Sequence, residues 1–206
     1  MSAAFRRVVA AAAFSAGTLV VLAETRQFAT VPLLGGSADW GFSSWRAITD
    51  QVRGGVSTAA LEPCAAGATF TGNLDPSKLS AGFAGMNLDV KVLPVSFSDL
   101  DGLKLGVLDA DGREYTLLLK MKGGESGSSY QVRFVPQKQT EFEALFEDFA
   151  AYRRSRPDAS APSLDKSQIE TLAIQIASNF TQQSGRFQLE LQSIAGLKSE
   201  AQRNLA

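Results

Sequence analysis

Histidine is absent from this chain of 206 residues. Without it the chain cannot form a Ser-His-Asp or Cys-His catalytic group, use histidine as a general base, or ligate zinc or iron through imidazole. The single cysteine, Cys64, excludes an internal disulfide and every CxxC metal or redox motif. We interpret Cys64 as a small, partly buried apolar residue, with a reactive thiol as the alternative.

Nucleotide-binding motifs are missing as well. The sequence contains neither GxGxxG nor a P-loop, and its glycine pairs at residues 35–36, 54–55 and 123–124 lack the following helix signal that phosphate binding needs. A formal net charge of −1 gives no general attraction to nucleic acid or to anionic lipid. We therefore expect no cofactor and no nucleic-acid partner.

Carboxyl groups are the remaining candidates for chemistry. Asp109 and Asp111 precede Gly112 as at the start of a calcium loop, but the further ligands and the distal Glu of an EF-hand are missing, which favours a turn. Acidic residues at 141–148 interleave with apolar ones, which indicates one buried and one solvated face rather than paired catalytic carboxyl groups. The sequence therefore predicts that the protein has no metal site and no catalytic residue and is not an enzyme.

Beyond residue 23, apolar residues mostly alternate with polar ones, and Gly, Asp, Pro and Ser separate the alternating segments. Residues 103–107 and 115–121 alternate most clearly, and the turn between them predicts a β-hairpin. Further strands are expected at residues 130–135, 172–176 and 187–191. With 45% hydrophobic residues the chain can fill one domain, and eight or so strands predict an all-β sandwich.

The first 23 residues contain no acid, carry Arg6 and Arg7, and are apolar from Val8 to Ala23. Three interpretations are open: a secretory signal, a mitochondrial presequence, or a short N-terminal apolar helix that anchors the protein in a membrane. The expected organisation is a targeting segment or membrane anchor at residues 1–23, a linker at 24–32, a β-sandwich domain at 33–197 and a polar C-terminal tail at 198–206.

The most distinctive motif lies at residues 50–57. Gly54 and Gly55 permit a positive φ or a close backbone approach. Asp50 and Ser57 can bond to nearby main-chain groups, and Arg53 offers a planar guanidinium for a carboxyl or for carbonyl groups. The motif predicts a shaped corner of the fold, and none of its groups implies catalysis.

This motif, Asp-x-Val-Arg-Gly-Gly-x-Ser, resembles the signature of the complex I intermediate-associated protein family, whose members help to assemble mitochondrial NADH:ubiquinone oxidoreductase. Other segments resemble the family in the same order: residues 34–36, 68–74, 81–85, 100–103, 111–115, 146–153 and 183–194. The resemblance covers roughly residues 33–196. It implies a jelly-roll β-sandwich similar to galactose-binding domains.

On this resemblance, a set of signature residues shapes one corner of the fold: Asp50, Arg53, Gly54, Gly55, Ser57, Gln183, Ser184 and Gly185. Contact with a partner is their alternative role, and we expect the Arg53 side chain to bond inward. Candidates for partner contact come from an aromatic and a basic cluster: Trp40, Phe42, Trp45, Arg153, Arg154 and Arg156. Core packing is the alternative for the aromatic cluster, and a solvated loop for the basic one.

Two functions are compatible with these features. The resemblance implies a non-enzymatic assembly factor or retained accessory subunit of respiratory complex I. Such a protein would bind complex I subunits or assembly intermediates and associate with the mitochondrial inner membrane through residues 8–22. The alternative is a secreted or lumenal carbohydrate-binding β-sandwich module, with Trp40 and Trp45 as sugar platforms. The signature and the single cysteine favour the first.

Overall fold

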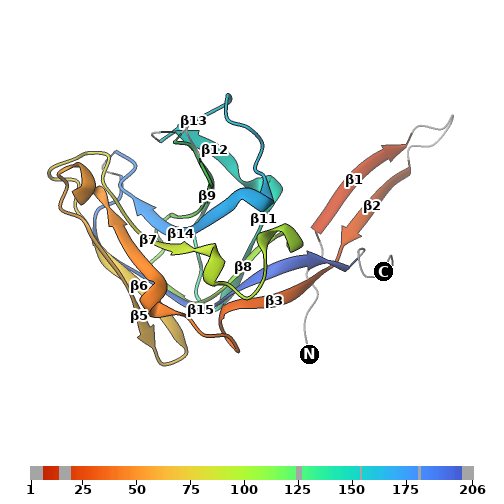
Figure 1. Ribbon diagram of the computed structural model, residues 1–206, viewed down its shortest axis with the longest axis horizontal. Coiled ribbons are helices and arrows are strands. Elements are labelled where there is room, and N and C mark those ends of the chain that lie inside the picture. Colours follow the sequence, from red (N-terminus) through yellow and green to blue (C-terminus); the bar gives the residue numbers. More distant parts are fainter. Residues whose placement is uncertain (1–6, 14–19, 124–126, 154, 181, 201–206) are drawn as a thin grey trace.

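The computed structural model describes residues 7–13, 20–123, 127–153, 155–180 and 182–200, with only the backbone described at 7–13 and 20–25. Two antiparallel sheets pack face to face (Figure 1). The helical segments of the described chain are short 3-10 turns: η1 (Phe42–Ser44), η2 (Asp50–Arg53), η3 (Val90–Val92), η4 (Phe97–Asp99), η5 (Phe146–Asp148) and η6 (Lys166–Gln168). The expected all-β sandwich is confirmed.

The first sheet has seven strands in the order β13-β12-β10-β9-β14-β7-β4. Their bounds are β4 (Trp45–Thr49), β7 (Phe83–Asp89), β9 (Tyr115–Met121), β10 (Ser129–Phe134), β12 (Ala150–Arg153), β13 (Arg156–Pro157) and β14 (Ile169–Ala177). Strands β9 and β14 lie at its centre, so the segments near the middle and the end of the chain pair directly.

The second sheet has six strands, with β11-β8-β15-β6-β5 in order and β3 paired to the far half of β15. Their bounds are β3 (Phe28–Gly35), β5 (Thr58–Cys64), β6 (Gly67–Leu74), β8 (Gly102–Ala110), β11 (Thr140–Leu145) and β15 (Gly185–Ser199). The pairing of β3 with β15 begins at Phe28 opposite Ser199, within the span expected to be a linker.

Alternating side chains of both sheets fill the space between them. On β9 the residues Tyr115, Leu117 and Leu119 are fully buried in the core, as the alternation predicted. An aromatic pair joins the two layers at one side, where the rings of Phe134 on β10 and Phe142 on β11 stack with centroids 4.3 Å apart. The core therefore depends on contacts between residues that no local pattern relates.

The predicted hairpin at residues 103–121 is wrong in its pairing, although both strands exist. Strand β8 pairs with β11 and β15 in one sheet, whereas β9 pairs with β10 and β14 in the other. The turn therefore crosses between the layers. Asp111 holds it there, because its carboxyl accepts from the Tyr115 hydroxyl at 3.1 Å and from the Gln188 main-chain N–H at 3.0 Å. Burial raises the pKa of the Tyr115 hydroxyl, which keeps the donor protonated.

The expected N-terminal apolar helix at residues 8–22 is also corrected. Strands β1 (Arg7–Ala13) and β2 (Val20–Arg26) pair as an antiparallel hairpin, which extends away from the sandwich in Figure 1. Valine pairs at residues 8–9 and 20–21 favour extended backbone, which the count of apolar residues alone did not show. Residues 14–19 lie outside the description. Among the described residues, no helix is both long and apolar enough to cross a bilayer.

The layer contact at Phe134 gives a stability prediction. Phe134→Ala removes a ring that is 6% exposed, so it should lower the free energy of unfolding by about 3–5 kcal/mol in a urea titration. The matched control is Val135→Ala at the next position, where the side chain is 57% exposed and the change should stay within about 0.5 kcal/mol. Equal losses in both variants would contradict this role of Phe134.

Candidate functional site

The corner at residues 50–57 is built around a fully buried carboxyl group. Asp50 begins η2, and its side chain accepts from the Ser57 main-chain N–H at 2.9 Å and from the Ser57 hydroxyl at 2.7 Å. The main-chain N–H of Gly55 donates to the Asp50 carbonyl at 2.9 Å. These bonds close the segment into a compact loop whose polar groups are satisfied internally.

Close packing around Asp50 explains two glycines. A Cβ on Gly55 would overlap the Asp50 carboxyl, and one on Gly82 would lie 2.8 Å from Asp50 Oδ2. Both positions therefore require the smallest residue. Gly54, at φ 83°, ends η2 in the left-handed region.

The loop is tied to the chain that follows β6. The Ser57 hydroxyl accepts from the Asp75 main-chain N–H at 3.0 Å, so this one side chain links Asp50 to the next loop. Hydrogen bonds from Ser77 lower the pKa of the Asp75 carboxyl. The corner is thus a network of mutually bonded groups rather than a set of free ones.

The second half of the signature forms a clamp at the neighbouring strand ends. The Gln183 side-chain amide donates to the carbonyls of Ala177 and Glu114 at 2.9 and 3.1 Å, and its oxygen accepts from the Glu114 N–H at 2.9 Å. The end of β14 is thereby fixed to the start of β9. Arg113 donates to the Ser184 carbonyl at 2.6 Å, and Gly185 begins β15 at φ 86°.

Ser178 brings the two halves together. It is fully buried, its main-chain N–H donates to the Gly82 carbonyl at 2.9 Å, and its hydroxyl donates to the Ser80 carbonyl at 2.6 Å. Its own carbonyl accepts from the Gln183 N–H at 3.0 Å. Because Gly82 also packs against Asp50, the signature residues share one end of the sandwich.

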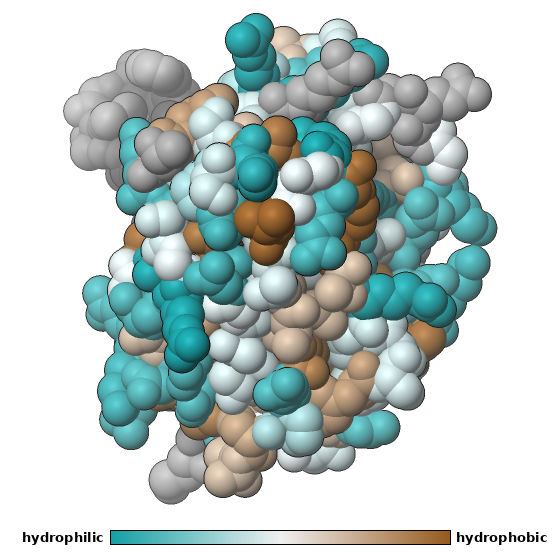
Figure 2. Space-filling view, turned by 90° about the vertical axis from the view of Figure 1, so that its left-hand side faces the viewer, coloured by the Kyte–Doolittle hydropathy of each residue, from teal (hydrophilic) through white to brown (hydrophobic). Residues whose placement is uncertain are grey.

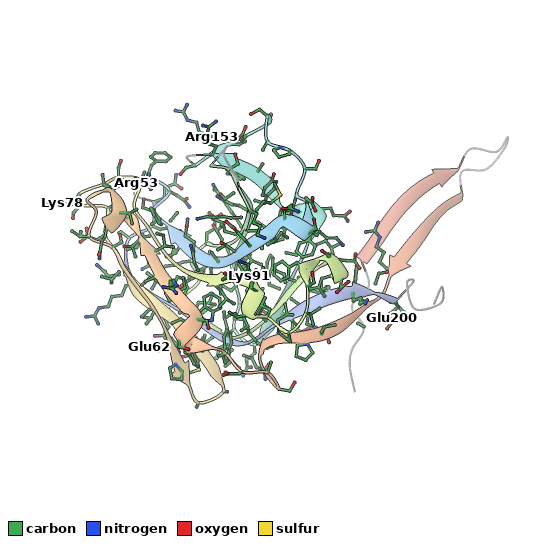
Figure 3. The ribbon with its side chains drawn as sticks, in the orientation of Figure 1. Arg53, Glu62, Lys78, Lys91, Arg153 and Glu200 are labelled. Carbon is green, nitrogen blue, oxygen red and sulfur yellow. The ribbon has the colours of Figure 1, made fainter. Side chains whose placement is uncertain are left out.

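Arg53 lies on the outside of this corner. Its side chain is exposed, and its Cζ lies 5.0 Å from the centroid of the Phe83 ring. No hydrogen bond among the described residues involves it, which differs from the inward bonding expected for it. The reason is that Asp50 already fills the interior of the corner. Figure 3 shows Arg53 at the end of the molecule that also carries Lys78.

The other candidates for partner contact lie in different environments. Trp40 and Trp45 are each 6% exposed, and the Trp45 indole donates to the Trp40 carbonyl at 3.1 Å, so both lie in the core. Phe42 is half-buried and stacks on Trp40. Arg153 and Arg156 are exposed near the edge of the seven-stranded sheet, and Arg154 lies outside the described residues.

A cleft of about 640 Å³ opens on the outer face of the seven-stranded sheet, beside the corner. Its floor consists of side chains at the strand positions that point away from the core, mostly amides and a lysine: Asn87, Leu118, Lys120, Gln131 and Gln175. Arg53 and Phe83 border it, and so do Arg133 and Tyr152. The Cζ of Arg133 lies 5.4 Å from the Tyr152 ring centroid, which repeats the arrangement of Arg53 and Phe83.

The rim of the cleft next to Gln183 carries an exposed aromatic residue. Phe180 is 69% exposed, with a left-handed φ of 56° that is uncommon for a bulky side chain. The amide of the preceding Asn179 donates to Glu114 Oε1 at 3.0 Å, which helps to hold this turn. Figure 2 shows the side of the molecule that carries Arg53 and Lys78 in Figure 3. Hydrophilic residues predominate there, with hydrophobic ones interspersed.

Sequence reasoning missed most of the cleft. The segment at residues 81–85 resembles a family motif, which indicates that Gly82 and Phe83 matter but not what they do. Lys120, Gln131 and Gln175 are polar members of alternating strands, which predicts only a solvated face. Ser178 gave no signal, because a buried serine cannot be told from a loop serine without knowing its partners.

Comparison with known proteins gives a family match. The model of the family described as complex I intermediate-associated protein 30 matches residues 36–191. An uncharacterized protein of Schizosaccharomyces pombe is 32% identical over 181 residues, covering 80% of this chain and 83% of that protein.

Solved structures show where the fold recurs. A family 11 carbohydrate-binding module from Clostridium thermocellum, in complex with a β-1,3-1,4-mixed-linked tetrasaccharide, superposes with a TM-score of 0.55 at 17% identity, covering 82% of this chain and 95% of that one. The family 11 module of a cellulosomal cellulase from the same organism gives 0.53 at 17% identity, covering 83% and 96%. At this identity the likeness concerns the fold alone.

The buried carboxyl group generates a second prediction. Asp50→Ala leaves the Ser57 N–H and hydroxyl without their acceptor, so it should lower the free energy of unfolding by about 1–3 kcal/mol in a chemical denaturation experiment. Asp39→Ala is the control, since Asp39 is exposed and should change stability by less than about 0.5 kcal/mol. If Asp50→Ala is as stable as the control, the corner does not depend on this network.

Proposed function

Because the chain belongs to the complex I intermediate-associated protein 30 family, we propose that it is a non-enzymatic binding protein of mitochondrial respiratory complex I, either an assembly factor or a retained accessory subunit. The observation that carries this proposal is the family match over residues 36–191, which runs from before η1 into β15. It therefore includes the corner, the Gln183 clamp and every strand of the cleft.

The geometry supports binding as the mode of action. The buried groups of the corner, Asp50, Ser57 and Ser178, are bonded to the chain around them, so they stabilise loops. The groups that face solvent in the cleft are amides, cations and rings on a rigid sheet. Such a surface recognises a partner without a change in its own backbone. The site of action we propose is the mitochondrial inner membrane, where complex I resides.

A second candidate function is carbohydrate binding. It is supported by the likeness of the fold to the family 11 modules, together with the presence of a polar cleft. Two features count against it. Trp40 and Trp45, the platforms expected for sugar, are buried, and the rings of Phe83 and Tyr152 in the cleft are each covered on one face by a guanidinium group. We therefore rank this function second.

Native-gel complexome profiling of the tagged full-length protein in its own cells tests the proposal. We expect the protein to migrate with complex I subunits. Migration with partial complexes identifies an assembly factor, whereas migration with the mature complex identifies a subunit. A protein that migrates with neither, and that binds mixed-linked β-glucan oligosaccharides on a glycan array, would overturn the proposal in favour of carbohydrate binding.

A further inference from the structure

The cleft is positively charged although the chain as a whole is not. In the described part of the chain, three cations, Arg53, Lys120 and Arg133, and one acidic side chain, Glu114, line it. Glu114 is engaged already, because its Oε1 lies 3.7 Å from Arg133 Nη1 and accepts from Asn179. Among the described residues, Arg53 and Lys120 have no ion-pair partner. A concave surface concentrates the field of such charges, so the cleft attracts anions while the net charge of the chain is −1.

The two arginines are oriented to bind carboxylates. Each guanidinium lies over an aromatic ring, Arg53 over Phe83 and Arg133 over Tyr152. Contact with the ring restricts the side chain, and the planar fork of donors in a guanidinium matches a carboxylate in a bidentate arrangement. The same contact covers one face of each ring.

The floor between the cations suits a polypeptide. Asn87, Gln175 and Gln131 come from β7, β14 and β10 and face the same side of the sheet. Side-chain amides carry both donors and an acceptor, as the main chain of a bound segment requires, although the Gln131 amide already donates one hydrogen bond to the Ser129 hydroxyl. The volume of about 640 Å³ lies within the ~300–1,000 Å³ of small-ligand clefts, so a short segment fits rather than a folded domain. Phe180 at the rim adds an exposed apolar contact.

We propose that this cleft docks a short acidic segment of a partner polypeptide, with carboxylate side chains bound by Arg53 and Lys120. The inference rests on the proposed function, because it takes the partner to be a protein, and it adds the surface and the chemistry of recognition. The signature corner then acts indirectly: the Asp50 network holds the loop that carries Arg53 at the edge of the cleft.

A direct binding experiment on the full-length protein tests the cleft. The probe is a fluorescein-labelled octapeptide of alternating Glu and Gly, compared with the same peptide carrying Gln for Glu. Wild-type protein should bind the Glu peptide at least tenfold more tightly than the Gln peptide, and raising the salt concentration should weaken that binding because the contact is ionic. Equal affinity for the two peptides would overturn the proposal.

Paired charge reversals locate the contact. Arg53→Glu with Lys120→Glu should weaken Glu-peptide binding at least tenfold, whereas Lys78→Glu with Lys91→Glu, exposed residues outside the cleft, changes the net charge equally and should stay within twofold. Thermal unfolding checks that both double variants fold. If Arg53→Glu with Lys120→Glu does not fold, the milder double variant Arg53→Gln with Lys120→Gln takes its place. Equal weakening in the cleft and control variants would show a non-specific charge effect and overturn the proposal.

Complexome profiling of the same variants separates this inference from the proposed function. If the wild type migrates with complex I subunits and the cleft variant does not, both stand. If both migrate with them, the proposed function stands and the cleft is not the docking site. If the wild type does not migrate with them, the proposed function fails. A further outcome is that the wild type binds the mixed-linked β-glucan tetrasaccharide. If the variant Arg53→Glu with Lys120→Glu abolishes that binding, the cleft is assigned to sugar and the inference is overturned.

Discussion

One buried carboxyl group organises the end of this molecule that carries the signature residues. Asp50 has no exposed surface, and Ser57 alone supplies two of its hydrogen bonds. A buried polar group without partners would cost about 1–3 kcal/mol, so the chain must approach Asp50 closely. That need fixes the path of the loop at residues 50–57, excludes side chains at Gly55 and Gly82, and places Arg53 on the outer side. The position of the Arg53 guanidinium at the surface thus depends on the Asp50 carboxyl in the interior.

The same strands build the core and the cleft. On β9, Leu117 and Leu119 point between the sheets, whereas Leu118 and Lys120 point to the outer face. Side chains of a strand point alternately to its two faces. When every second residue fills the core of the sandwich, the residues between them lie on the outer face, where they can contact a partner. The outer face that lines the cleft is therefore supported by the packed core beneath it. Segments between the strands add its borders, among them Arg53 and Phe180.

Sequence patterns predicted much of the fold and little of the site, for physical reasons. Alternation located β9, β10, β14 and the first half of β15, because burial of one face is a local property. It could not show that β8 and β9 lie in different sheets, since pairing depends on distant strands. An apolar count predicted a helix where the valines favour strands. The motif predicts local bonding for Asp50 and inward bonding for Arg53, but Asp50 is buried and Arg53 is exposed. Both side chains are polar, so only packing decides which of them is buried.

The arrangement of arginine over aromatic rings separates two functions that one architecture can host. A sandwich of this kind gives no function by itself, and the family 11 modules show that a similar fold supports sugar binding in other proteins. Sugar recognition needs an open ring face, whereas carboxylate recognition needs a fixed fork of donors. In this cleft Phe83 and Tyr152 each orient a guanidinium group, so the rings serve the arginines rather than a ligand directly. The arginine contacts on the outer face, and not the fold beneath it, are therefore what support our proposal of a protein partner.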